Sequence, residues 1–211
     1  MLGRLSIVLT HELFHFFVPN ALTLDGDYDW FFEGFTLYQA LRTAVRLGFI
    51  DFQEYLATMA RVYDSYRATP ERDALSLIEA TQRRWTATSS LVYDKGMLVA
   101  FLYDLRLRYK SKNRQSLDDV YRELFHEYSV GARRVDGNEA IITLLNRFDG
   151  DGQLSERYLV NPGAINLETE LPAYGLMVET SGNGIRFEVS RTLNNEQRGM
   201  LASLGYRKPR K

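Results

Sequence analysis

Apolar residues recur three to four positions apart along most of the chain, which is the spacing of one face of an α-helix. This pattern predicts helices at residues 2–17, 28–47, 51–67, 71–83, 90–109, 116–128, 137–147 and 153–160. Pro19 would end the first helix, and the acidic turn DGDYD at 25–29 offers carboxylates to cap the second. Gly48 is placed to end that second helix.

The pattern changes near the C-terminus. The stretches LMVE and IRFEV flank TSGNG, which predicts a small β-hairpin with a glycine-rich turn, and LNNEQRGMLASLG is typical of an amphipathic helix. We therefore expect a mainly α fold with a small β-hairpin near the C-terminus. The change of pattern divides the chain into a helical domain at residues 1–175 and a hairpin-plus-helix appendix at residues 176–211.

The composition narrows the function only by exclusion. Of 211 residues, 45% are hydrophobic, and a net charge of -1 gives no general attraction to nucleic acid or to acidic membranes. No apolar run reaches the ~18 residues of a membrane-spanning helix, and MLGRLSIVLT lacks the cleavage site of a signal peptide. Because the chain has no cysteine, disulfides and thiolate metal sites are excluded. The compartment stays open between the cytoplasm and a bacterial periplasm.

Candidate chemistry begins in HELFH at residues 11–15. Helical residues four apart share a face, so His11 and His15 can present two imidazole nitrogens to one metal ion. Glu12 is offset on the helix surface and can act on a water at that ion without being a ligand. The alternative is a buried helix whose two histidines only donate to backbone carbonyls. Uncharged neighbours favour a helix buried on both sides of the site, namely Val8, Leu9, Leu13, Phe14, Phe16 and Phe17.

A third ligand is available in DWFFEGFTLY. Glu33 follows His15 by 18 residues, and the turn between the two predicted helices would set them antiparallel. A carboxylate among aromatic residues is costly to bury unpaired, and a cation would remove that cost. Two histidines and a glutamate are an established ligand set for hydrolytic zinc, which keeps its fourth position for water. The alternative places Glu33 on a solvated face.

Tyr93, in VYDKG, is a candidate hydrogen-bond donor. Hydrolysis of a peptide bond builds negative charge on the carbonyl oxygen, and removing one donor aimed at that oxygen commonly costs about 10²- to 10³-fold in rate. Because the chain has 13 tyrosines, the pattern alone gives Tyr93 only a weak claim to this role.

The motifs HELFH, WFFEGFTLY and VYDKG, in this order and at these distances, resemble the catalytic domain of the glycyl aminopeptidase family of gluzincin zinc metallopeptidases. The phrase EGFT and the stretch ERYLVNPGAINLETELPAYGL favour this branch over the related aminopeptidase N family. The resemblance spans roughly residues 5–178. It implies a thermolysin-like helical domain that hydrolyses peptide substrates, as an aminopeptidase does, with zinc between two antiparallel helices.

Carried over to this sequence, the resemblance implies that His11, His15 and Glu33 bind Zn²⁺. It implies that Glu12 is the general base toward a metal-bound water and later the proton shuttle. It also implies that Tyr93 stabilises the oxyanion.

Two departures from the family pattern affect the expected function. The family carries an N-terminal β-rich domain with a substrate-binding segment before HExxH, and many members carry a PDZ domain, whereas neither is evident here. We therefore expect a piece of a longer protein that contacts a missing N-terminal domain. Two alternatives stay open: an aminopeptidase N-like or endopeptidase gluzincin, and a non-catalytic zinc-containing scaffold or binding domain. Intact Glu12 and Tyr93 argue against the scaffold, because structural zinc needs neither.

Overall fold

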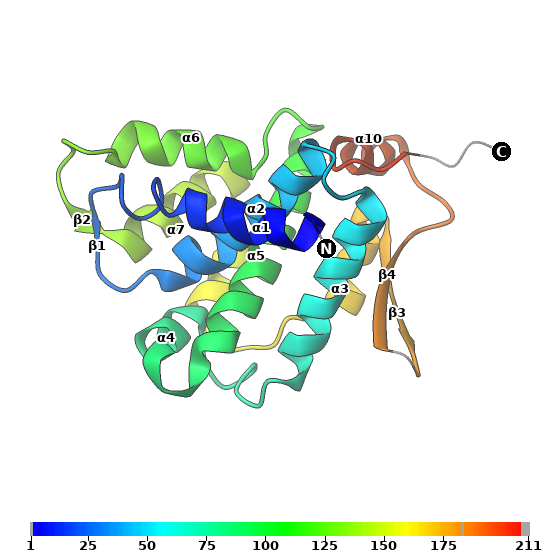
Figure 1. The fold of residues 1–211 in the computed structure, drawn as a ribbon, viewed down its shortest axis with the longest axis horizontal. Coiled ribbons are helices and arrows are strands. Elements are labelled where there is room, and N and C mark those ends of the chain that lie inside the picture. The colour runs from blue at the N-terminus through cyan, green and yellow to red at the C-terminus, as the bar shows by residue number, and fades with distance from the viewer. Residues whose placement is uncertain (1, 183, 208–211) are drawn as a thin grey trace.

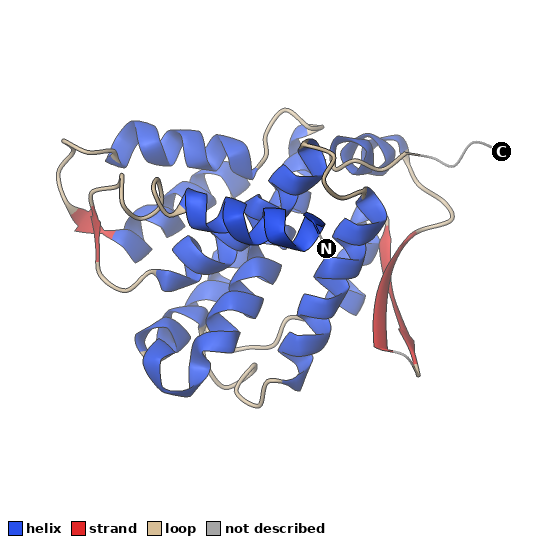
Figure 2. Ribbon diagram, in the orientation of Figure 1, coloured by secondary structure: helices blue, strands red, loops and turns tan. Residues whose placement is uncertain are grey.

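The computed structural model describes residues 2–182 and 184–207 and is mainly helical (Figures 1 and 2). Its α-helices are α1 (Leu2–Phe14), α2 (Thr36–Arg46), α3 (Phe52–Ala68), α4 (Leu77–Gln82), α5 (Ser89–Ser111), α6 (Leu117–Tyr128), α7 (Gly137–Asp149), α8 (Gln153–Ser155), α9 (Leu167–Glu170) and α10 (Asn195–Ser203). Wider π-helical segments are η1 (Trp30–Phe35), η2 (Arg84–Thr88) and η3 (Glu156–Val160), and η4 (Leu171–Tyr174) is a 3-10 turn. The predicted fold class is confirmed.

Helix α5 passes through the middle of the molecule (Figure 1). Its side chains are buried around the whole helix, as Leu98, Phe101 and Leu105 illustrate with no exposed surface. A helix that is apolar on every side must be covered on every side, and α2, α3, α4, α6, α7 and α10 pack around it. Within the described residues, none of the helices combines the length and the apolarity needed to cross a membrane.

Local signals explain where several helices begin and end. Ser76 forms a reciprocal capping box with Glu79, so α4 starts at Leu77 and is shorter than the predicted helix at 71–83. Gly48 lies just beyond α2 with a φ of 73°, the left-handed conformation that suits a glycine at a helix end. The acidic turn was expected to cap the second helix, but Asp29 makes no capping hydrogen bond. Its carboxylate pairs with Arg84 instead.

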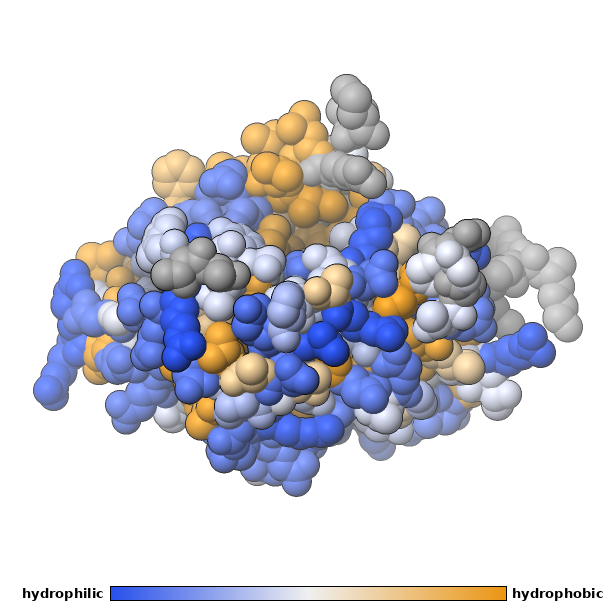
Figure 3. Space-filling view, turned by 90° about the horizontal axis from the view of Figure 1, so that it is seen from below, coloured by the Kyte–Doolittle hydropathy of each residue, from blue (hydrophilic) through white to orange (hydrophobic). Residues whose placement is uncertain are grey.

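Helix α1 differs from the prediction in length and in burial. It ends at Phe14 rather than at residue 17, and turns follow it. It packs on α2 along one face only, and the opposite face is open. The expectation that the helix is buried on both sides is therefore wrong. More than half of the surface of each of these side chains is exposed: Leu5, Val8, Leu9, Leu13, Phe16 and Phe17. Figure 3 shows this apolar face at the upper edge of the molecule.

The strands are few and lie at two ends of the molecule (Figure 2). β3 (Leu176–Ser181) and β4 (Gly184–Val189) form the antiparallel hairpin that the sequence predicted, with Val178 opposite Phe187. β1 (Leu24–Asp25) pairs in parallel with β2 (Val135–Asp136), which the sequence did not predict. Strands of two residues are too short to leave a periodic pattern.

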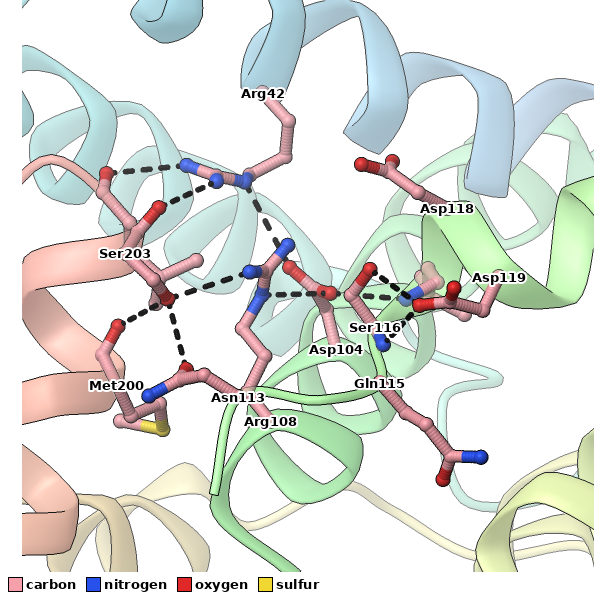
Figure 4. Close-up of polar contacts among 12 residues, drawn as sticks. Arg42, Asp104, Arg108, Asn113, Gln115, Ser116, Asp118, Asp119, Met200 and Ser203 are labelled. Atoms are coloured by element: carbon pink, nitrogen blue, oxygen red, sulfur yellow. Dashed lines mark hydrogen bonds and ion pairs between the residues drawn. The ribbon is translucent and has the colours of Figure 1, made fainter. Parts of the chain in front are cut away.

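The C-terminal segment packs on the helical body. β4 lies against α3, and α10 lies against α5. Arg42, on α2, donates to the carbonyl oxygens of Leu204 at 3.1 Å and Ser203 at 3.2 Å, at the end of α10 (Figure 4). Its Nε also lies 3.7 Å from the carboxylate of buried Asp104 on α5. The division into a domain at 1–175 and an appendix at 176–211 stays a prediction.

Candidate metal centre

His11 and His15 bring two imidazole nitrogens together at the end of α1. His11 is on the last turn of the helix and is 7% exposed. His15 follows the end of the helix, and the chain there continues as a turn that keeps its ring on the same side. The two Nε2 atoms are 3.1 Å apart. The two histidines therefore share a face, as their spacing of four residues predicted.

The contacts of the two Nδ1 atoms indicate which ring nitrogen of each histidine carries the hydrogen. His15 Nδ1 is 3.0 Å from the carbonyl oxygen of Val18, which can only accept, so this nitrogen carries the hydrogen. His11 Nδ1 is 3.2 Å from Thr36 Oγ1, and the Thr36 hydroxyl donates its own proton to backbone carbonyls of η1. Thr36 must then accept from His11. With Nδ1 as the donor on each ring, the Nε2 atoms of His11 and His15 turn toward the same point, where each could give a lone pair to a metal ion.

Glu33 completes the convergence from η1. Its side chain is 8% exposed, and its Oε2 is 3.1 Å from His11 Nε2 and 3.5 Å from His15 Nε2. Three electron-rich atoms that face one another in a buried place need a cation or a proton between them. A tetrahedral zinc ion with bonds of about 2.0–2.1 Å separates its ligands by roughly 3.3 Å, which agrees with these distances. The donor set fits zinc.

Arg84 is part of the same cluster, and the sequence analysis missed it. From η2 its guanidinium donates to Glu33 Oε1 at 2.6 Å, to the Tyr93 hydroxyl at 2.8 Å and to Asp29 Oδ2 at 2.7 Å.

Burial raises the pKa of the Glu33 carboxyl. The side chains of His11 and Tyr93 and the Arg84 guanidinium outweigh that effect, so the pKa lies below its ordinary value. Glu33 is thus a carboxylate at neutral pH.

Tyr93 lies on the first turns of α5, beside the Glu33 carboxylate. Burial raises the pKa of its phenol to about 12, and the negative charge of Glu33 acts in the same direction. The phenol therefore keeps its proton at neutral pH and can donate a hydrogen bond.

Glu12 stands apart from the three converging side chains. It is exposed on α1, next to buried His11, and does not belong to the His11, His15 and Glu33 cluster. A carboxylate on the open side of the helix can reach a reactant from solvent.

A close crossing of backbones sets the spacing between Glu33 and Tyr93. A Cβ built on Gly34 would lie 2.5 Å from the Cα of Gly96, and one built on Gly96 would lie 2.7 Å from the carbonyl oxygen of Trp30. Side chains at either position would hold η1 and α5 apart. The two glycines that follow Glu33 and Tyr93 in EGFT and VYDKG therefore let the two elements touch.

Residues 4–99 match the family model described as M61 glycyl aminopeptidase. The predicted family resemblance is confirmed. The M61 match contains HELFH, EGFT and VYDKG, and it also contains Arg84. No curated protein matches the chain.

The fold also matches a solved structure. The crystal structure of an aminopeptidase N family protein from Idiomarina loihiensis superposes with a TM-score of 0.69 and 23% sequence identity. The match covers 85% of this chain and 34% of that chain. At this level of identity the likeness shows the fold. The present chain spans about a third of the length of that protein.

Proposed function

We propose that this chain is the helical catalytic part of a zinc-dependent peptidase, with the metal held by His11, His15 and Glu33. The convergence of three lone-pair atoms within 3.5 Å carries the proposal. The match of residues 4–99 to a peptidase family supports it. When bound, zinc supplies a Lewis acid that lowers the pKa of a coordinated water toward about 7 and polarises the scissile carbonyl.

Two side chains near the metal position carry out proton transfer and stabilise the developing negative charge. Glu12 accepts the proton of the attacking water and passes it to the leaving amine, because its carboxylate is exposed beside His11. Tyr93 donates to the carbonyl oxygen as negative charge develops there, and its raised pKa keeps the phenol protonated for this purpose. The family match favours aminopeptidase action over endopeptidase action.

The number of ligands favours catalysis over a structural zinc site. In the described part of the chain, the cluster consists of two histidines and one glutamate. Structural zinc is almost always held by four protein ligands, whereas catalytic zinc keeps one position for water or substrate. A scaffold role would also leave Glu12 and Tyr93 without a purpose.

The open face of α1 supports contact with another domain of the same polypeptide. Contiguous exposed apolar surface of this kind marks an interaction site, and the similar solved structure extends well beyond the 34% of its chain that this chain matches. Hydrogen exchange in α1 should be slower in a longer polypeptide that carries such a domain than in residues 1–211 alone. Equal exchange in the two would contradict this contact.

Zinc content and turnover test the proposal together. Elemental analysis should find near one zinc per chain in the parent and little in Glu33→Ala. Glu12→Gln should keep the zinc and lose turnover of peptide substrates by about 10²-fold or more, because general base catalysis is removed while the ligands stay. Near-normal turnover in Glu12→Gln, or no zinc in the parent after refolding with the metal, would overturn the proposal.

A further inference from the structure

Arg84 contacts both of the side chains that the proposed reaction uses on this side of the site. One nitrogen, Nη2, donates to Glu33 Oε1 at 2.6 Å and to the Tyr93 hydroxyl at 2.8 Å. The other, Nη1, donates to Asp29 Oδ2 at 2.7 Å. The Arg84 side chain is only 12% exposed. One rigid fork on η2 therefore fixes the relative position of three groups: Asp29 just before η1, Glu33 on η1 and Tyr93 on α5.

The fork leaves one Glu33 oxygen for the metal. Oε1 is held by Arg84, whereas Oε2 faces the Nε2 atoms of His11 and His15. A free carboxylate could rotate and exchange its oxygens, but one tied to a planar guanidinium cannot do so without losing a charge-assisted hydrogen bond.

The guanidinium is itself held in place. Asp29, at the start of η1, pairs with Nη1, whereas Glu33 pairs with Nη2. Its central carbon lies 4.8 Å from the ring centroid of Trp85, 5.4 Å from that of Tyr93 and 5.8 Å from that of Phe32. Stacking on aromatic rings and a second carboxylate are both interactions that suit arginine better than lysine.

We propose that Arg84 is a positioning residue: it presents Glu33 Oε2 to the metal and holds the Tyr93 hydroxyl beside the same carboxylate. This inference rests on the proposed metal centre. Arg84 would also weaken metal binding, because its positive charge repels a nearby metal ion. Asp29 offsets that repulsion with a negative charge, and we infer that the orienting effect of Arg84 outweighs the repulsion that remains.

Metal affinity separates orientation from charge. Zinc dissociation constants are measured by competition with a chelator for the parent, Arg84→Lys and Arg84→Gln. Lysine keeps the charge and loses the fork, and glutamine loses the charge. If orientation dominates, both variants bind zinc roughly 10- to 100-fold more weakly, which is the usual effect of removing a group that orients a metal ligand. Tighter binding by Arg84→Gln, or unchanged binding by both, overturns the inference.

Cobalt substitution gives a readout that a merely structural role would not move. The visible spectrum of Co²⁺ in the site should change in Arg84→Lys, because the coordination by Glu33 changes. Arg106→Lys is the matched control: its side chain is 20% exposed and pairs with Asp149 and Asp151 at a distance from these ligands in the fold. It should lower the Tm and leave the zinc affinity and the cobalt spectrum as in the parent. A cobalt spectrum unchanged in Arg84→Lys overturns the inference.

Asp29→Asn guards against a failure of the Arg84 variants to fold. This substitution weakens the ion pair that holds Arg84 and leaves Glu33 unchanged. It should therefore reduce zinc affinity, but by less than the Arg84 variants do. Unchanged affinity in Asp29→Asn overturns the inference. Zinc in the parent that is lost in Glu33→Ala but unaltered in the Arg84 and Asp29 variants overturns only the role of Arg84. A parent that binds no zinc, or zinc that survives Glu33→Ala, overturns the metal centre and this inference with it.

Discussion

Tyr93 and Lys95 are two residues apart at the start of α5 and have different surroundings. Tyr93 faces the Glu33 carboxylate and the Arg84 guanidinium at the candidate site. Lys95 is fully buried, and its Nζ donates to the carbonyl oxygens of Leu75 at 3.1 Å and Gly163 at 3.0 Å. One side chain thus lies at the candidate site, and the other ties two loops to the central helix.

Replacing Tyr93 by phenylalanine tests its part in the reaction. Tyr93→Phe should reduce turnover of a peptide substrate by about 10²- to 10³-fold, because one donor to the oxyanion is lost. Zinc content should not change, since Tyr93 is outside the ligand cluster. Steady-state kinetics and elemental analysis check the two statements, with Tyr109→Phe on the same helix as the control. Unchanged turnover would remove Tyr93 from the mechanism.

Lys95 should make stability depend on alkaline pH. Burial lowers the pKa of its ammonium group from 10.5 to about 8, and Asp73 and Glu79 partly oppose this. Between pH 8 and 10.5 the unfolded chain therefore binds more protons than the folded chain, so the free energy of unfolding rises with pH. The rise across this window is on the order of 3 kcal/mol.

Lys95→Met isolates this contribution, because other groups that titrate in the same window are common to both proteins. Urea denaturation of the parent and the variant at several pH values should show the parent gaining stability relative to Lys95→Met as the pH rises through 8. A difference that stays constant across the window would contradict the pKa shift of Lys95.

At the scale of elements, the crossing of η1 and α5 is the contact that assembles the site. Trp30, which is fully buried, anchors the start of η1, and its indole nitrogen donates to Asn138 Oδ1 at 2.7 Å. Gly34 and Gly96 remove the side chains that would otherwise separate the two elements. Glu33 and Arg84 both lie on π-helical segments, which are frequent at functional sites.

A methyl group at this crossing should be destabilising. Gly96→Ala would place a Cβ 2.7 Å from the carbonyl oxygen of Trp30, and overpacking of this kind costs about 1–3 kcal/mol. Set against the gain of about 1 kcal/mol in helix propensity, the net change is a loss of up to about 2 kcal/mol. Gly199→Ala on α10 is the control, since its nearest neighbour is a side-chain atom at 3.4 Å. Thermal unfolding should show a lower Tm for Gly96→Ala only, and equal Tm changes would contradict the close crossing.

At the scale of the whole molecule, a buried polar network joins the C-terminal segment to the helical body. Asp104, 1% exposed, accepts from the Tyr38 hydroxyl at 2.8 Å, from Arg108 Nε at 3.0 Å and from the backbone nitrogen of Leu117 at 3.1 Å. Arg42 connects this network to the last carbonyls of α10 (Figure 4). A cation at the C-terminal end of a helix is favourable in itself.

Removing Arg42 should therefore loosen more than one contact. Arg42→Ala should lower the free energy of unfolding by about 3–5 kcal/mol, because a buried charge network loses one partner. Arg46→Ala, one turn further along α2, should cost about 1 kcal/mol or less, since its side chain is 65% exposed and pairs with Asp118 at the surface. Urea denaturation measures both. Equal costs for the two variants would show that the Arg42 network contributes little.

The sequence by itself determined the features that depend on local spacing. Positions four apart predicted that His11 and His15 share a face, and the glycine-rich turn predicted the hairpin of β3 and β4. Helical periodicity also located most of the helices, because it records which face of each segment avoids water. The three motifs together identified the family resemblance. That His11, His15 and Glu33 act as ligands stays a prediction, although the structure brings them within 3.5 Å of one another.

Only the tertiary structure decided what covers each face and which distant side chains meet. Arg84 is 51 residues from Glu33 in sequence. It is one arginine of a basic pair, and the sequence around it does not indicate which side chains it contacts. The apolar pattern of α1 is compatible with burial on one side or on both sides. In the fold, only one side is covered. Periodicity indicates which face of a helix is apolar, but packing between separate elements decides whether protein covers that face.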